Sequence, residues 1–409
     1  MDLDIPPFEC CRVVNQRATR RAGYGERQRA VLDPAGWTAA RDEIATWTGY
    51  EPTPLVPLPG LASALGVGGI WYKDESLRFD LNSFKALGGA YAVLRLLVRE
   101  IERRKNISGV TSPDLLAGGH KDIAGELTVT CATDGNHGRS VAWGAYLFGC
   151  NCVIFIHENV SQARQQAIEY YGARVERVPG NYDDSIKHAA QMAEKHGWYV
   201  VSDTSYPGYM DVPRHVMEGY TVLAGEVVEQ LDGARPSHLF VQGGVGGFPA
   251  AVIARLWEAW GAERPWASVV EPDRAACILE SIQAGEPRVV GGDLDTLMAG
   301  LACGTVSLLA WEILAEGADD VMAVPDTGVG PAMKLLAEGV GDDPPLVAGE
   351  SAVAGLLGLI AARRDEEVSK KMGLGPESEV LLIGTEGDTD PDLYRDLVGQ
   401  RGESVRKRQ

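Results

Sequence analysis

The sequence has no apolar stretch long enough to span a bilayer, and its first residues, MDLDIPPFECC, carry acids where a secretory signal would carry Lys or Arg. We therefore expect a cytoplasmic protein without a membrane segment. Basic residues are scarce too: 38 Lys and Arg stand against 57 Asp and Glu, which gives a formal charge of -19 at pH 7. A surface of this charge repels a phosphate backbone, which argues against nucleic acid as a partner.

The basic runs that do occur are short and contain no interleaved aromatic residues. Residues 99–105 and 406–408 are interpreted as a solvated helix face and a frayed terminus. Cysteines are few as well, seven in all, and no two of them form a CxxC pair. This pattern argues against a disulfide framework and against a zinc site, so we expect no metal.

Short β-rich apolar runs alternate with longer helix-like segments, which is typical of an α/β protein with parallel strands. The length of 409 residues predicts two domains with a ligand cleft where they meet. The predicted strands are 127–132, 152–156, 198–201, 239–242, 268–271 and 380–383. The predicted helices are 83–103, 137–148, 163–171, 183–196, 213–231 and 248–260.

The first informative motif is KDESLRFDLNSFKALGGAYAVLRLLV at residues 73–98. Asn82 or Ser83 is expected to cap a helix whose first turn contains Lys85. The helix dipole and partial burial would lower the pKa of this lysine, as a Schiff-base nucleophile requires. Taken alone, however, a lysine near a helix start is more often a solvated surface residue.

A second motif, TVTCATDGNHGRSVAWGA, runs from a strand into a helix. Backbone amides at such a turn form an anion site, which suits a substrate carboxylate, and Asn136 can donate to a ring oxygen. An ordinary turn in which Asp134 or Asn136 caps the helix is the alternative. The candidate substrate-binding residues are Thr133, Asp134, Gly135, Asn136 and His137. His137 is left out of the catalytic set, because packing at the helix start explains it.

Two further loops follow strands. HLFVQGGVGGFPAAVIARLW puts a glycine-rich turn before a helix, where a phosphate can approach the backbone closely. The candidate phosphate-binding residues are Gly243, Gly244, Val245, Gly246 and Gly247. The loop lacks the Lys-Ser/Thr of a nucleotide P-loop and the GxGxxG spacing. In VLLIGTEGDTDPDLY, Thr385 follows a late strand and can hydrogen-bond a ring nitrogen, although acidic loops after strands are usually solvated.

Taken in this order, the four motifs resemble the fold type II pyridoxal-phosphate (PLP) enzymes, the tryptophan synthase β-like family. The resemblance implies two open, twisted, mostly parallel sheets flanked by helices, with the active site in the interdomain cleft. It also implies that Lys85 holds PLP, that the DGNHG turn binds the substrate carboxylate, that the GGVGG loop binds the cofactor phosphate, and that Thr385 faces the pyridine nitrogen.

Longer matches, among them SDTSYPGYMDVPRHVMEGY and TLMAGLACGTVSLLAWEIL, resemble one branch, the diaminopropionate ammonia-lyases. The resemblance implies a small domain at 86–209, a large PLP-binding domain at 1–85 and 210–409, and a homodimer. It brings Cys277 and Cys303 near the cleft, and whether they bond stays open. Gly384 departs from the branch, which commonly has Ser there, and residues 305–306 interrupt another matched stretch.

Asp134 supports this branch independently, because its charge would repel a substrate carboxylate unless a cation lay nearby. A second amino group on the substrate is such a cation. We therefore predict elimination of ammonia from 2,3-diaminopropionate, giving pyruvate and two ammonia, with Lys85, Asp134 and Asp203 as catalytic residues. Asp134 and Asp203 would serve opposite faces of the α-carbon, so that both enantiomers react. A turn aspartate is the alternative for Asp203.

Two other functions remain open at this point. One is a serine or threonine dehydratase, or a β-replacement synthase, on the same fold. The other is a PLP-binding protein without turnover. The enantiomer preference and any need for a monovalent cation are not determined by the sequence.

Overall fold

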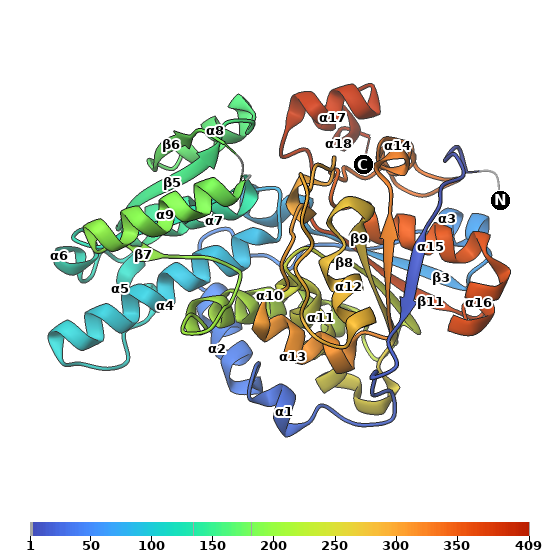
Figure 1. Cartoon of the computed structure of the whole chain (residues 1–409), viewed down its shortest axis with the longest axis horizontal. Helices are drawn as coiled ribbons and strands as arrows, with labels where there is room; N and C mark the ends of the chain where they lie inside the picture. The colour runs from blue at the N-terminus through green and yellow to red at the C-terminus, as the bar shows by residue number, and fades with distance from the viewer. Residues whose placement is uncertain (1–2, 134, 181, 409) are drawn as a thin grey trace. The chain divides into compact units, whose positions relative to one another are not determined.

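We describe the protein from a computed structural model, which covers residues 3–133, 135–180 and 182–408 apart from the side chain of Asp183. The chain folds into two compact units (Figure 1). Unit 1 contains the residues up to Val31, Pro52–Ser83 and the chain from Leu223 onward. Unit 2 contains Leu32–Glu51 and Phe84–Val222. The expected domain boundaries at 86–209 stay a prediction.

Unit 1 is built on a mixed sheet with the strand order β1-β10-β9-β8-β11-β3-β2. The two edge strands pair antiparallel with their neighbours, and all the other pairs are parallel. Apolar residues fill both faces of the central strands, as a parallel sheet covered by helices requires. The strands are β1 (Cys11–Val14), β2 (Leu55–Pro57), β3 (Gly69–Asp74), β8 (His238–Gln242), β9 (Trp266–Pro272), β10 (Asp320–Val324) and β11 (Glu379–Gly384).

Helices and 3-10 turns connect these strands. Helix α15 packs across strands β8, β9 and β10, while α11 packs against α13 and β8. The helices of unit 1 are α1 (Glu26–Arg29), α3 (Pro59–Leu65), α11 (Gly247–Trp260), α12 (Cys277–Ala284), α13 (Leu308–Gly317), α14 (Val329–Glu338), α15 (Ala354–Arg364), α16 (Glu366–Met372), α17 (Pro391–Val398) and α18 (Gly402–Arg406). The 3-10 segments are η1 (Glu75–Asp80), η2 (Gly261–Glu263), η3 (Asp273–Ala275), η4 (Ala299–Leu301) and η5 (Asp326–Gly328).

Unit 2 is built on a parallel sheet with the strand order β6-β5-β4-β7. Its strands are β4 (Thr128–Ala132), β5 (Asn151–His157), β6 (Arg174–Val178) and β7 (Tyr199–Val200). Its helices are α2 (Pro34–Ile44), α4 (Lys85–Lys105), α5 (Ser112–Leu116), α6 (Lys121–Ala124), α7 (Asn136–Phe148), α8 (Gln162–Glu169) and α9 (Tyr182–His196). Helix α10 (Asp211–Gln230) begins in unit 2 and ends in unit 1.

The α/β class predicted from the sequence is confirmed, and every predicted strand and helix overlaps one that the structure contains. Strands β1, β2, β3, β6 and β10 were not predicted. Across the described part of the chain, no helix is both long enough and apolar enough to cross a membrane.

Candidate active site

Lys85 is the first residue of helix α4. The predicted cap by Asn82 or Ser83 is wrong, because the N-cap is Phe84, which makes no side-chain cap bond. Tertiary pairing explains the difference: Ser83 forms a β-bridge with Glu386, and the carbonyl of Asn82 accepts a 2.9 Å bond from the amide of residue 387. These contacts commit Asn82 and Ser83 to the chain around Glu386, so neither residue caps the helix.

Close packing holds this end of α4 in place. A Cβ atom at Gly88 would lie 2.3 Å from Cε1 of Tyr220, and one at Gly89 would lie 2.4 Å from Oγ of Ser140. Both distances are too short for real atoms, so α4 approaches α10 and α7 only because these two residues are glycines. The Ser140 hydroxyl also accepts a 3.1 Å bond from the amide of Ala90. The packing of α4 against α10 and α7 therefore fixes the position of Lys85.

The Lys85 ammonium forms an ion pair with Asp203, with 2.6 Å between Nζ and Oδ2. The two side chains are 17% and 15% exposed, so the pair is accessible. Burial raises the pKa of Asp203, but Lys85 and His137 together outweigh burial, and the net pKa lies below its ordinary value. Asp203 is thus held as a carboxylate at neutral pH, in the form that can accept a proton. Asp203 therefore does more than cap a turn, which was the alternative interpretation of this residue from the sequence.

Two aromatic rings lie beside the Lys85 amine. Its Nζ atom lies 5.6 Å from the ring centroid of Phe84 and 5.8 Å from that of Tyr220. The two rings are 4.7 Å apart, and burial raises the pKa of the Tyr220 hydroxyl well above its ordinary value. Neither ring was predicted from the sequence to belong to the site. Phe84 could have been predicted, because it precedes Lys85 in the sequence, whereas Tyr220 is brought to Lys85 only by the fold.

The turn before α7 is organised by Thr133. Its hydroxyl accepts 3.0 Å bonds from the amides of Gly135 and Gly138, so it satisfies the helix start that Asp134 or Asn136 was considered to cap. The N-cap is Gly135. Asp134 lies outside the described residues, and its predicted catalytic and binding roles stay a prediction.

His137 is buried at the start of α7. Its Nε2 atom lies 2.8 Å from the carbonyl oxygen of Val201, which sets Nε2–H as the donor. Burial lowers the pKa of His137, so the ring is neutral at physiological pH. This packed histidine agrees with its omission from the catalytic set. Asn136, the first residue of the same helix, is half-buried.

The glycine loop in unit 1 connects β8 to α11. A Cβ atom at Gly243 would lie 2.6 Å from Cγ1 of Val269, and Gly246 has a φ of 91°, a conformation that favours glycine. Gly246 is also the N-cap of α11 and makes no side-chain cap bond there. The loop therefore brings glycine backbone to the start of a helix, which is where a phosphate binds well. Val245 anchors it through a 2.8 Å bond from the amide of Ser307 to its carbonyl.

Thr385 follows directly after β11 and is buried. The residue before it, Gly384, is the predicted departure from the branch, and the structure gives the reason. A Cβ atom at this position would lie 2.0 Å from the hydroxyl oxygen of Tyr72 on the neighbouring strand β3. The tyrosine hydroxyl therefore occupies the space that a serine side chain would need.

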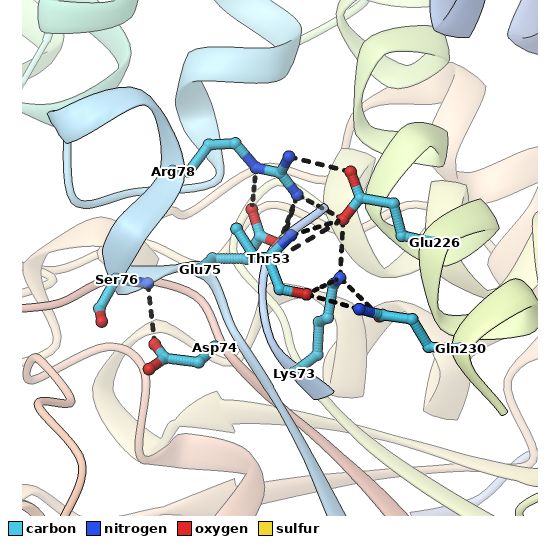
Figure 2. A network of polar contacts seen from close by, with 8 residues as sticks. All are labelled: Thr53, Lys73, Asp74, Glu75, Ser76, Arg78, Glu226 and Gln230. Atoms are coloured by element: carbon cyan, nitrogen blue, oxygen red, sulfur yellow. Dashed lines mark hydrogen bonds and ion pairs between the residues drawn. The ribbon is translucent and has the colours of Figure 1, made fainter. Parts of the chain in front are cut away.

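A buried network of charges anchors the segment that precedes Lys85 (Figure 2). Arg78 donates to Glu75 at 2.8 Å and to Glu226 at 2.7 Å, and Lys73 pairs with Glu226 at 2.7 Å. Thr53 joins the network, since its hydroxyl donates to Glu75 at 2.5 Å. All of these side chains are almost completely buried. The network was not predicted from the sequence, because Glu226 is distant along the chain.

The two cysteines left open by the sequence lie beside the glycine loop. Sγ of Cys277 is 3.6 Å from the carbonyl oxygen of Gly244, and a Cβ at Gly244 would lie 3.5 Å from Sγ of Cys303. Cys277 is buried, and burial raises the pKa of its thiol. Within the residues that the structure describes, no group of three or more His, Cys, Asp or Glu side chains could hold a metal ion.

Known proteins resemble this chain over most of its length. The family model described as pyridoxal-phosphate dependent enzyme matches residues 46–385. The diaminopropionate ammonia-lyase of Escherichia coli K12 is 40% identical over 364 residues, which cover 87% of this chain and 89% of that protein. The crystal structure of the selenomethionine-labelled holo form from Escherichia coli has a TM-score of 0.87 and 36% identity, covering 97% of this chain and 98% of that chain.

A second crystal structure of the Escherichia coli enzyme, in complex with D-serine, has a TM-score of 0.87 and 35% identity, covering 98% of this chain and 100% of that one. The chain belongs to the PLP-dependent enzymes of fold type II, and its cofactor is pyridoxal phosphate. Within them it belongs to the diaminopropionate ammonia-lyase family, a family of carbon–nitrogen lyases.

Proposed function

We propose that this chain eliminates ammonia from 2,3-diaminopropionate, giving pyruvate and two molecules of ammonia with the uptake of one water. The observation that carries the proposal is the carboxylate of Asp203 held 2.6 Å from the Lys85 amine. An acidic side chain at the reacting lysine suits a substrate with a second ammonium group, which serine and threonine lack.

The residues present fit PLP. The glycine loop at the start of α11 would hold its phosphate through Gly243, Gly244, Val245, Gly246 and Gly247. The Thr385 hydroxyl would meet the ring nitrogen, Asn136 would donate to the ring oxygen, and Lys85 would form the Schiff base. When bound, the cofactor supplies an electron sink for the negative charge that develops at the substrate α-carbon.

The protein's own groups then move the protons. Either the neutral amine of Lys85, freed of its proton, or the ionised Asp203 removes the α-proton, and the low pKa of Asp203 keeps that residue in its carboxylate form. The β-amino group must leave protonated, and the proton shared between Lys85 and Asp203 is available for this step. Amides of the Thr133–His137 turn would hold the substrate carboxylate, with Asp134 near its second ammonium.

We further propose that Asp134 and Asp203 act on opposite faces of the α-carbon, so that both enantiomers react. A cytoplasmic location and a homodimer complete the proposal, and both rest on the sequence analysis and on the family. The substrate expected for this chain is a small amino acid.

The test is pyruvate and ammonia formation by the purified holoenzyme with D- and L-2,3-diaminopropionate, D- and L-serine and threonine, each assayed separately. We expect two ammonia per pyruvate from the diamine, and rates at least tenfold lower from serine and threonine. Faster turnover of serine or threonine would move the chain to the dehydratases. A cofactor absorbance band without any pyruvate would make it a binding protein.

Variants sharpen the assignment of the two acids. Asp203→Asn should lower kcat for one enantiomer by about 10² to 10⁴ and leave the other less affected, with the reverse pattern for Asp134→Asn. Asp122→Asn is a matched control, since Asp122 is an exposed aspartate of the same unit that pairs with Lys105 at 3.1 Å. Equal losses for both enantiomers in both variants would reject the two-face hypothesis.

A further inference from the structure

Three arginines stand one turn apart on helix α4: Arg95, Arg99 and Arg103. Together with Val212 and His215 of α10 they line a hollow of about 420 Å³. Like charges spaced four residues apart on a helix repel each other, and this row occurs on a chain with a formal charge of -19. This row is therefore a locally positive surface on a negatively charged protein, and a bound anion would relieve its repulsion.

The protein supplies little of that charge. Arg103 donates to Glu100 at 2.8 Å, while Nε of Arg99 lies 3.6 Å from the same carboxylate. Nε of Arg95 is buried and has no hydrogen-bond partner in the part of the chain that the structure describes. A buried guanidinium donor without a protein acceptor can be satisfied by an oxygen of a bound anion.

The other charged groups around the hollow are already bonded. The carboxylate of Glu102 accepts from the amides of Gly109 at 2.6 Å and Val110 at 3.1 Å. His215 lies 2.8 Å from Glu218. Arg95 and Arg99 are therefore the two guanidinium groups of this face that are least engaged by protein carboxylates.

Aromatic rings line the adjoining hollow. This second hollow, of about 320 Å³, shares Leu96, Arg99 and Val212 with the first and is lined by Trp198, Tyr206 and Tyr209 as well. The rings of Tyr206 and Tyr209 stack with centroids 5.0 Å apart and 18° between their planes, and Tyr206 is 52% exposed. The basic run lacks interleaved aromatics in the sequence, but the fold places aromatic rings beside it.

We propose that the two hollows form one groove that binds a nucleoside monophosphate. Arg95 and Arg99 bind the phosphate, because guanidinium groups match phosphate oxygens in pairs. The base lies on the exposed ring of Tyr206, because a flat base stacks on an aromatic face whatever its sequence identity. All lining residues belong to unit 2.

Occupancy of the groove would be transmitted to Asp203, a consequence that rests on the proposed function. The hydroxyl of Tyr209 donates to the carbonyl of Val200 at 2.9 Å and accepts from the amide of Ser202 at 3.0 Å. Ser202 immediately precedes Asp203. A base stacked on the Tyr206–Tyr209 turn would therefore shift the backbone next to Asp203 and with it the carboxylate that pairs with Lys85.

The test is calorimetric titration of the holoenzyme with AMP, adenosine, inorganic phosphate and free PLP. AMP should bind, and the other three should bind at least tenfold more weakly. Arg99→Met and Tyr206→Ala should each weaken AMP binding at least tenfold. Both side chains are more than half exposed, so the fold should survive, and circular dichroism checks this. Arg104→Met removes the same charge from a residue paired with Glu126 and should leave binding unchanged.

Three results would each overturn the proposal that this groove binds a nucleoside monophosphate. They are no AMP binding, phosphate bound as tightly as AMP, and an AMP affinity that Arg99→Met and Tyr206→Ala leave unchanged. PLP bound more tightly than AMP would assign it to the cofactor instead. Binding needs no turnover, so its failure is distinguishable from failure of the proposed reaction. AMP binding that leaves kcat and KM for the diamine unchanged would overturn the transmission to Asp203 alone.

Discussion

Lys73 and Lys85 lie in the same segment of the chain and each contacts a carboxylate, but their surroundings differ. Nζ of Lys73 donates to the carbonyl of Thr53 at 2.7 Å, to Glu226 at 2.7 Å and to Gln230 at 2.9 Å (Figure 2). An ammonium has three protons, so all of them are used. Lys73 is also completely buried, whereas the side chain of Lys85 is 17% exposed.

The difference shows what separates a structural lysine from a reactive one. Burial lowers the pKa of Lys73, and the charges of Glu75 and Glu226 oppose that effect. The three hydrogen bonds of the Lys73 ammonium leave it no lone pair and no access for an incoming carbonyl group. Lys85 has a carboxylate on one side and aromatic faces beside its amine, with solvent access remaining. A low pKa alone therefore does not make a nucleophile, since the amine must also be reachable.

The largest effect that would test this comparison is Lys85→Ala. We expect elimination activity to fall by about 10³-fold or more, because the proposed function gives this residue the roles of Schiff-base amine and proton carrier. The free energy of unfolding should fall by about 1–3 kcal/mol, because Asp203 loses its partner in a partly buried ion pair. Pyruvate formation and thermal unfolding measure the two effects. Full activity in this variant would end the proposed role of Lys85.

Lys73→Met should show the opposite pattern. Removing Lys73 takes one donor each from Glu226, the Thr53 carbonyl and Gln230 within a buried network, at a cost of about 3–5 kcal/mol. The melting temperature should fall, while activity per folded molecule stays within a few-fold of the wild type. Lost activity with unchanged stability would show that Lys73, and not only Lys85, takes part in the chemistry.

A matched double variant sharpens this result. Lys73→Met combined with Glu226→Gln removes one charge of each sign and leaves the Arg78–Glu75 pair, which is 2.8 Å long, in place. We expect the double variant to be more stable than the sum of the single changes predicts, by about 1–3 kcal/mol. Strict additivity would mean that the two side chains do not stabilise each other.

The smallest expected effect is on acid stability. Burial raises the pKa of Asp203, but Lys85 and His137 outweigh it, so the folded pKa lies below the unfolded value of about 3.9. The ion pair therefore stabilises the protein above about pH 4, and that contribution is lost as the pH falls toward the folded pKa. Asp203→Asn should lose this part of the pH dependence. Identical melting curves of the two proteins from pH 3 to pH 7 would contradict the assignment.

The sequence predicts strands β8 and β11, which precede the glycine loop and Thr385, but misses strand β3, which precedes the Lys85 segment. The glycine loop and Thr385 each follow a predicted strand, and the glycines there are required by local backbone geometry that one motif can signal. Strand β3 was missed because it contains Lys73 and Asp74, charges that are typical of a turn. The network with Glu226 makes Lys73 compatible with a buried strand, and Asp74 accepts a 3.0 Å bond from the amide of Ser76.

The same limit explains the other misses. Strand β10 begins with Asp320, whose charge is met by Arg12 on β1, and no local pattern predicts that pairing. The cap expected at Ser83 was replaced by a bridge to Glu386. Tyr220 reaches Lys85 only because Gly88 lets α4 and α10 approach. Each of these contacts joins residues far apart in the sequence, so periodicity and spacing carry no signal for it.

The most direct test of the distinction between the two lysines is reduction of the holoenzyme with borohydride, followed by proteolysis and mass spectrometry. Borohydride converts the Schiff base to a stable secondary amine and so marks the lysine that holds the cofactor. We predict a pyridoxyl label on the peptide that contains Lys85 and none on Lys73. A label on Lys73, or on any lysine other than Lys85, would contradict the account.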